Sequence, residues 1–173
     1  MFARSVRNRI VKEIRECMTK WYAGDHIHAA CLYWAGMTCY WIRTRYRVRA
    51  IIQAGSMSWP CVDKDDGMSP THFSYVFDPD DPASRAALRS GQMPEMHVWA
   101  AIPTDKTIID LTTCYLIQQA KHRANIEWTA PMPPDHLWCR ADDLPPGVLY
   151  RPAPEATLWA HEKVMRSFPY RAS

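Results

Sequence analysis

Long hydrophobic runs are missing from this chain. No stretch of about 18 consecutive apolar residues occurs among its 173 residues, so we expect no transmembrane helix. The N-terminal stretch MFARSVRNRIVKEIRECMTK has no apolar core of the kind that a secretory signal contains. The sequence therefore predicts a cytoplasmic protein that does not enter a membrane. Release as an effector without a classical signal is the alternative.

Several short motifs with a defined chemistry are also absent. The six cysteines stand at scattered positions and form no CxxC pair, so neither a zinc ribbon nor a thioredoxin-type motif is indicated. Without an export signal, scattered cysteines suggest reduced thiols. Neither GxxxxGK[ST] nor GxGxxG occurs, so nothing indicates nucleotide binding. We expect a protein without a cofactor.

The chain lacks a strong charge of one sign. Its 21 Lys and Arg against 18 Asp and Glu give a net charge of +3, which does not by itself indicate a nucleic-acid-binding protein. Four arginines are concentrated in RTRYRVR, residues 43–49. We interpret this segment as a solvated helix end that runs into an edge strand. A site for an acidic partner, such as a nucleic acid, is the alternative.

What the sequence does contain is clear periodicity, compatible with one domain over residues 1–173. Predicted helices cover residues 4–22, 26–44, 113–123 and 154–166, with a short helix between an N-cap at Asp81 and Gly91; predicted strands cover 48–62, with a possible bend at Gly55, and 72–77, 96–102 and 107–112. The proline-rich segment 129–154 predicts an ordered wrap across the surface. Helices, then antiparallel strands, then helices indicate the α+β class, with the N-terminal helices packed on an antiparallel sheet.

Three residues have the chemistry of a thiol-dependent catalytic site. Such a site needs a thiolate, a histidine that takes and returns a proton, and a group that orients the histidine. Cys31 lies early in the second predicted helix, His97 begins one strand of the predicted hairpin, and Asp110 ends the other. With a turn at PTDK, residues 97 and 110 come close to being paired, so a carboxylate there can hold the tautomer of the imidazole.

The segment that contains these residues resembles the core of the transglutaminase-like, papain-like superfamily. In that family a helix that opens with the catalytic cysteine precedes an arginine-bearing strand ending on glycine, and Arg49 and Gly55 fill those places. The family then has a histidine, a small residue and a tryptophan, followed by an aspartate before a threonine, matched here by HVW at 97–99 and DLT at 110–112. The resemblance covers about residues 26–115.

The resemblance implies a cysteine-dependent acyl-transfer enzyme that acts on a peptide or protein. Cys31 would attack an amide or thioester carbonyl, His97 would take the thiol proton and pass it to the leaving group, and Asp110 would orient His97. Family members use a glutamine before the cysteine in the oxyanion hole, but Asp25 stands near that position. Only the backbone N–H of Cys31 is then identified as a donor, and the second donor is left open.

Further residues are expected around the site. His28, Trp34 and Trp99 are predicted to contact the substrate, although Trp99 also suits the core. His26, His28 and Cys31 have metal-binding side chains, but no fourth ligand is apparent, so no metal site is predicted. The sequence does not choose between a peptidase, an amidase, a glutamine deamidase and a transglutaminase. A catalytically inactive scaffold of the same fold and a nucleic-acid-binding module are the alternatives, and no oligomeric state is predicted.

Overall fold

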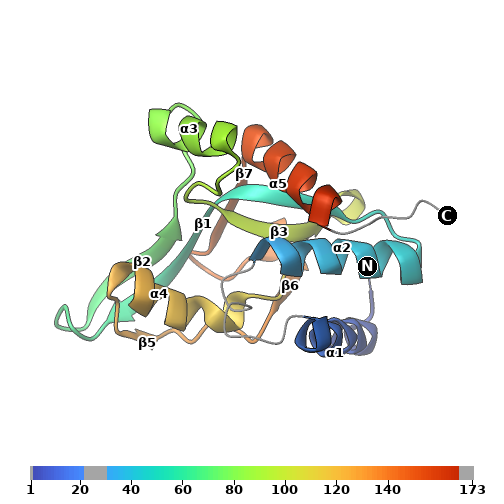
Figure 1. Ribbon diagram of the computed structural model, residues 1–173. Coiled ribbons are helices and arrows are strands. Elements are labelled where there is room, and N and C mark those ends of the chain that lie inside the picture. Colours follow the sequence, from blue (N-terminus) through green and yellow to red (C-terminus); the bar gives the residue numbers. More distant parts are fainter. Residues whose placement is uncertain (1, 22–30, 168–173) are drawn as a thin grey trace.

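The computed structural model describes residues 2–21 and 31–167, and these form a mixed structure of helices and one curled antiparallel sheet (Figure 1). The elements are α1 (Arg4–Trp21), α2 (Cys31–Tyr46), β1 (Ile51–Asp63), β2 (Ser69–Tyr75), α3 (Pro82–Ser90), β3 (His97–Ile102), β4 (Thr107–Asp110), α4 (Leu116–Ala124), β5 (Trp128–Ala130), β6 (Leu137–Arg140), β7 (Leu149–Pro152) and α5 (Pro154–Ser167), with 3-10 turns at Pro103–Asp105, Thr113–Tyr115 and Ala141–Asp143. The α+β class is confirmed.

The long strand β1 organises the sheet, because it pairs with four other strands. On one edge, β1 pairs first with β3 and then with β2, which lie end to end. On the opposite edge it pairs with β7 and then β5. The order continues from β3 through β4 to β6, and all pairings are antiparallel. The end-to-end placement brings the last residue of β2, Tyr75, next to the first residue of β3, His97.

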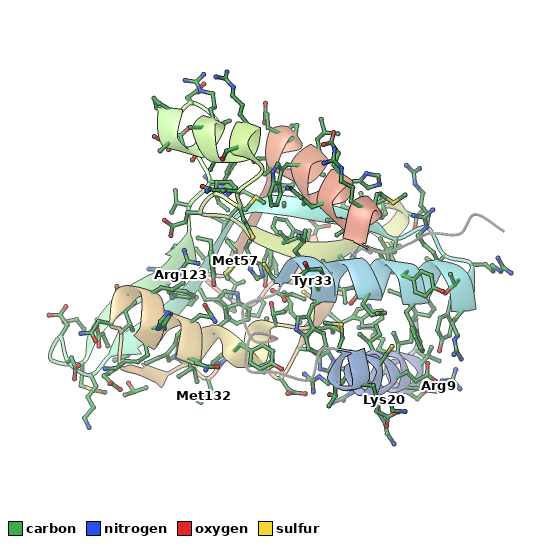
Figure 2. The ribbon with its side chains drawn as sticks, viewed as in Figure 1. Arg9, Lys20, Tyr33, Met57, Arg123 and Met132 are labelled. Atoms are coloured by element: carbon green, nitrogen blue, oxygen red, sulfur yellow. The ribbon has the colours of Figure 1, made fainter. Side chains whose placement is uncertain are left out.

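The two faces of the sheet carry two separate apolar clusters. Alternation along β3 sends Val98 and Ala100 into a cluster with α1, α2 and α5. Trp99 points to the other face, into a cluster with β2, β7 and α4 that includes Met57 (Figure 2). Two charged side chains of α1, Arg9 and Lys20, are exposed and point to solvent (Figure 2). None of the described helices has both the length and the apolar character needed to span a membrane.

The local signals at α3 are confirmed by its caps. The Asp81 side chain accepts a hydrogen bond of 2.8 Å from the backbone N–H of Ser84, and Gly91 ends the helix in the left-handed conformation at φ 77°. The second predicted helix is also present, as α2, but residues 26–30 of the prediction lie outside the described residues. Its last turn contains Arg43 and Arg45 of the arginine-rich segment, as expected.

Two expectations differ from the structure. β1 continues through Gly55, where the family pattern has the strand end. A Cβ at residue 55 would lie 2.1 Å from the backbone oxygen of Arg151, so glycine permits the close approach of β7. The segment 129–154 is ordered, but it does more than wrap across the surface. It contains β6, β7 and the last two residues of β5. Between its prolines, stretches of only a few residues are sufficient for strands at the margins of the sheet.

Candidate active site

His97 and Asp110 form a buried pair at the start of β3 and the end of β4. The Nε2 atom of His97 lies 2.7 Å from Oδ2 of Asp110, and the residues are 3% and 2% exposed. The register, in which Ala100 pairs with Ile109, places Asp110 opposite residue 99. The sequence suggested that His97 and Asp110 are close to directly paired. His97 instead lies two residues along β3 from the position opposite Asp110, so the two residues are diagonal neighbours. Both side chains still share one face of the sheet, which is why they meet.

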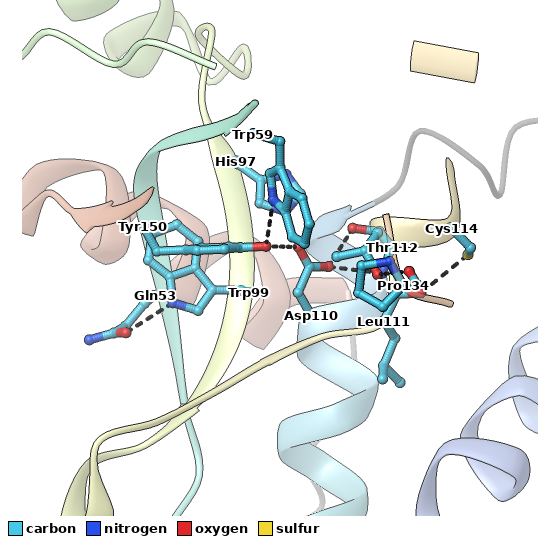
Figure 3. Close-up of polar contacts among 11 residues, drawn as sticks. Gln53, Trp59, His97, Trp99, Asp110, Leu111, Thr112, Cys114, Pro134 and Tyr150 are labelled. Atoms are coloured by element: carbon cyan, nitrogen blue, oxygen red, sulfur yellow. Dashed lines mark hydrogen bonds and ion pairs between the residues drawn. The ribbon is translucent and has the colours of Figure 1, made fainter. Parts of the chain in front are cut away.

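Both carboxylate oxygens of Asp110 accept hydrogen bonds from neighbouring residues (Figure 3). Oδ1 accepts hydrogen bonds from the backbone N–H of Thr112 at 2.8 Å and from its hydroxyl at 2.6 Å. Oδ2 accepts a hydrogen bond from the hydroxyl of Tyr150 at 2.8 Å, in addition to its contact with His97. Burial raises the pKa of Asp110, but the charge of His97 and these hydrogen bonds outweigh it and keep the pKa below 3.8. Asp110 is therefore ionised and fixed in orientation.

The imidazole of His97 is protonated at neutral pH. Burial lowers its pKa, but the charge and hydrogen bond of Asp110, followed by the influence of Cys31, raise the pKa of His97 to about 10. Rings on three elements surround it. The Trp99 ring is stacked at a centroid distance of 6.3 Å, Tyr75 lies at 5.3 Å, and Tyr150 lies at 6.2 Å. The ring plane of His97 is thus set by packing as well as by Asp110.

The thiol of Cys31 lies in a small cavity with His97. This cavity has a volume of about 30 Å³, enough for one water-sized group. Its lining consists of Cys31, Tyr75, Met93, His97, Thr112, Tyr115, Leu116 and Gln119. Cys31 is the first residue of α2 and is 7% exposed. The fold therefore brings together the three predicted catalytic residues, from α2, β3 and β4.

The remaining ring nitrogen of His97, Nδ1, is buried and forms no hydrogen bond with any residue that the structure describes. The Cys31 side chain is near enough to contribute to the raised pKa of His97, both as a charge and as a hydrogen-bonding group. A direct Cys31–His97 hydrogen bond of standard geometry is nevertheless not formed. Nδ1 is thus adjacent to the thiol and not engaged by another described group.

The three predicted substrate contacts have different outcomes. Trp99 is 1% exposed, packs on His97 and does not line the Cys31 cavity, so its place is in the core beside the imidazole. Trp34 is 4% exposed, and its ring lies 6.4 Å from that of Tyr115, a residue of the cavity wall. His28 lies outside the described residues, as do Asp25 and His26. A substrate contact by Trp34 or His28 stays a prediction.

Several residues at the site were not identified from the sequence. Tyr150 arrives from the proline-rich segment, which carries no local signal for a contact with Asp110. Tyr75 ends β2, and burial, with the neighbouring charge of Cys31, raises its pKa to about 12, so its hydroxyl is protonated. Arg123 of α4 lies over the Tyr75 ring, 4.7 Å from its centroid. Gln119, one turn earlier on α4, is the side-chain amide in the cavity wall.

Among residues 2–21 and 31–167, no three His, Cys, Asp or Glu side chains lie close enough together to hold a metal ion. All six cysteines are free thiols.

Comparison of the chain with protein-family models, with curated proteins and with solved structures found no significant match.

Proposed function

We propose that this protein is a cysteine-dependent acyl-transfer enzyme with a papain-like or transglutaminase-like core, acting on an amide or thioester of a peptide or protein. The observation that carries the proposal is the state of His97. Its Nε2 is bound to an ionised and immobilised Asp110, while its Nδ1 is buried, without a described partner, in the cavity that contains the Cys31 thiol. This is the arrangement that thiol catalysis requires.

The chemistry follows from these positions. The Cys31 sulfur, as a thiolate beside the His97 imidazolium, adds to the carbonyl carbon, and the carbonyl π electrons move to oxygen. When the carbon–nitrogen or carbon–sulfur bond breaks, Nδ1–H of His97 protonates the leaving group. Water then attacks the thioester of Cys31, Nδ1 takes its proton, and the thiolate leaves with the bonding pair. Asp110 keeps its charge throughout and stabilises the imidazolium.

The residues of the site stay the same whichever molecule attacks the acyl-enzyme, but the reaction changes. The enzyme is a peptidase if water attacks after cleavage of a peptide bond, and a deamidase if water attacks after loss of ammonia from glutamine. It is a transglutaminase if an amine attacks. The small volume of the cavity supports a mode of binding in which only the reacting carbonyl enters, while the rest of the substrate lies on the surface outside.

Gln119 supplies the missing oxyanion donor in this proposal. Its amide lines the same cavity as the Cys31 thiol, although it comes from α4 and not from the segment before the cysteine. Together with the backbone N–H of Cys31 it gives two donors for the developing oxyanion. Replacing Gln119 by Met removes the donor at similar side-chain length. Loss of one such donor reduces kcat by about 100-fold or more in known cases.

Thiol labelling tests the proposal without a known substrate. At pH 7 we expect iodoacetamide to label one thiol rapidly and the other five slowly. The fast phase should disappear in Cys31→Ala and slow strongly in His97→Asn, because the imidazolium that stabilises the thiolate is then lost. Cys114→Ala is the matched control. Cys114 is more exposed than Cys31, but burial raises its pKa, so its removal should leave the fast phase unchanged.

Hydrolysis of p-nitrophenyl acetate then separates catalysis from mere thiol reactivity. The wild-type protein should turn over repeatedly, and Gln119→Met should lower turnover while the fast labelling of Cys31 persists. Uniformly slow labelling of all six thiols, or fast labelling that is unaffected by His97→Asn, would contradict the proposal. An inactive scaffold of the same fold would then be the better interpretation.

A further inference from the structure

The arginine-rich segment 43–49 contributes nothing to the proposed active site. Its four arginines lie in the last turn of α2 and in the residues that lead to β1, and all four are exposed. Cys31 begins the same helix, and at about 1.5 Å of rise per residue the two ends of α2 are roughly 22 Å apart. The segment therefore forms a second surface, distant from the Cys31 cavity.

A fifth arginine reaches this surface from α1, which runs antiparallel beside α2 (Figure 1). The indole N–H of Trp41 donates a hydrogen bond of 2.8 Å to Oε2 of Glu13. Residues four apart share a helix face, so Arg9 lies on the face of Glu13. Arg9 is exposed (Figure 2), and the Arg45 guanidinium lies over Trp41, 4.6 Å from the ring centroid. We call this surface the arginine-rich end, and its members are Arg9, Arg43, Arg45, Arg47 and Arg49.

Positive charge prevails at the arginine-rich end. Residues 31–62 contain four arginines and no Lys, Asp or Glu. Two carboxylates border the end, those of Glu13 and Asp105. No acidic residue within 2–21 and 31–167 forms an ion pair with Arg47 or Arg49. These two charges are therefore available to an external anion.

Arg47 stands at a backbone position that glycine or asparagine usually fills. It follows the last residue of α2 and has a φ of 56°, in the left-handed region. A residue with a Cβ loses free energy in this conformation, which glycine adopts readily. The helix dipole favours basic residues within the last turn, but Arg47 lies beyond it. An arginine at this cost indicates that its guanidinium has a use other than ending the helix.

The composition of the segment favours phosphate as the anion. Every basic residue within 31–62 is an arginine. The planar guanidinium donates paired hydrogen bonds to phosphate oxygens, whereas a lysine ammonium acts as a point charge. Successive arginines therefore fit a chain of phosphates better than they fit a diffuse negative surface.

An exposed aromatic side chain accompanies the arginines. Tyr40 lies one turn before Arg43 and is 37% exposed. The bases of a single strand stack on aromatic rings of this kind. Among the large exposed apolar side chains that the structure describes, only Tyr40 belongs to α1 or α2. A helix that binds a bilayer normally inserts several apolar side chains, so a single-stranded nucleic acid is the better match.

We propose that the arginine-rich end binds single-stranded nucleic acid, with phosphates held by its five arginines and a base stacked on Tyr40. The site stands independently of the proposed catalytic activity, because Cys31 lies at the other end of α2. Cys31→Ala should therefore bind nucleic acid as the wild type does. Failure of the thiol chemistry and failure of this proposal are thus distinguishable.

Fluorescence anisotropy of a fluorescein-labelled oligothymidylate of about 20 nucleotides tests the proposal. Non-specific binding of this kind has a Kd of about 1–100 µM at physiological salt, and we expect about 10 µM. Each phosphate contact adds about −0.7 to the slope of log K against log salt for a single strand. Five arginines should therefore give a slope of about −3.5.

Matched variants locate the binding. Arg49→Gln should weaken binding about fourfold at about 0.15 M salt and reduce the slope by about 0.7, because one phosphate contact is lost. Arg89→Gln is the control, because Arg89 is equally exposed but lies on α3. Tyr40→Ala should weaken binding at least about fivefold, whereas Tyr40→Phe should retain it.

Two further variants separate binding from folding and from charge. Arg47→Gly should weaken binding about fourfold and yet raise the Tm by about 2–4 °C, because glycine suits the left-handed conformation. A more stable variant cannot lose binding through misfolding. Changing all four arginines of 43–49 to lysine keeps the charge and the salt slope, but should weaken binding by about threefold or more, because the paired hydrogen bonds are lost.

Three results would overturn the proposal. The first is no saturable anisotropy change up to about 200 µM protein, twenty times the expected Kd. The second is binding of polyglutamate, or of vesicles containing phosphatidylserine, at least as tight as that of the oligothymidylate, which would assign the surface to an acidic protein or to a membrane. The third is oligothymidylate binding that Arg47→Gly, Arg49→Gln and Tyr40→Ala all leave unchanged, which would place the strand elsewhere.

Discussion

Replacing Asp110 by Asn is the most informative single change at the candidate site. The substitution keeps the size and one carbonyl oxygen, so the two hydrogen bonds from Thr112 can persist. It removes the charge and places an N–H donor where Oδ2 now accepts from His97 and Tyr150. The amide can then only donate to Nε2 of a neutral imidazole, which puts the remaining ring proton on Nδ1, toward Cys31. The resting imidazolium is thereby replaced by a neutral ring whose tautomer cannot take a proton from Cys31.

The size of the effect follows from the electrostatics of His97. With Asp110 ionised, the pKa of His97 lies at about 10 instead of 6.5, although burial alone would lower it. At 1.36 kcal/mol per pKa unit, the environment favours the imidazolium by on the order of a few kcal/mol. In Asp110→Asn the lowering by burial remains and the opposing charge is gone. We therefore expect the pKa of His97 to fall below 6.5, so that the ring is neutral at pH 7.

The same reasoning gives the pH dependence of stability. His97, with a raised pKa, contributes stability that is fully present below 6.5 and is lost as the pH rises through about 10. Asp110, with a lowered pKa, contributes stability that is present above 3.8 and is lost as the pH falls below that value. The stability difference between wild type and Asp110→Asn should therefore be largest between about pH 4 and 6.5. There it should reach roughly 3–5 kcal/mol, the usual effect of breaking a buried pair.

Two measurements check this prediction. Imidazole nitrogen shifts in protein labelled with ¹⁵N-histidine report the protonation of His97, assigned by the signal lost in His97→Asn. Urea unfolding across the pH range gives the stability difference. A His97 that titrates with the same pKa in wild type and Asp110→Asn, or a stability difference independent of pH, would refute the assigned ion pair.

The remaining predictions concern supporting contacts. Tyr150→Phe removes the hydroxyl that donates to the buried carboxylate of Asp110, so urea unfolding should show a loss of about 2 kcal/mol; a change under about 0.5 kcal/mol would mean that this hydrogen bond adds little. Gly55→Ala forces a Cβ to within 2.1 Å of the Arg151 oxygen, so β7 must separate from β1, and thermal unfolding should show a loss of about 3 kcal/mol; a wild-type Tm would contradict this packing. Thr107→Val removes an unpaired buried hydroxyl and should raise the unfolding free energy by about 1 kcal/mol, whereas a destabilised variant would indicate that the hydroxyl has a partner.

The sequence by itself determined the elements with strong local signals. Asp81, Pro82 and Gly91 bracket α3 because capping and left-handed termination depend on the residues at the helix ends alone. The two apolar runs on either side of the PTDK turn similarly predicted a hairpin, and with it the proximity of His97 and Asp110. The order of helices and strands was enough for the α+β class.

Only the tertiary structure decided the surroundings of that pair. Tyr150 contacts Asp110 because β7 pairs with the far edge of β1 and the sheet curls, and nothing local in a proline-rich segment encodes that distant pairing. Tyr75 meets His97 because β2 and β3 lie end to end along β1, and Gln119 reaches the cavity of Cys31 through the packing of α4. Local patterns record periodicity and capping, whereas contacts between distant segments depend on strand register and on the curvature of the whole sheet.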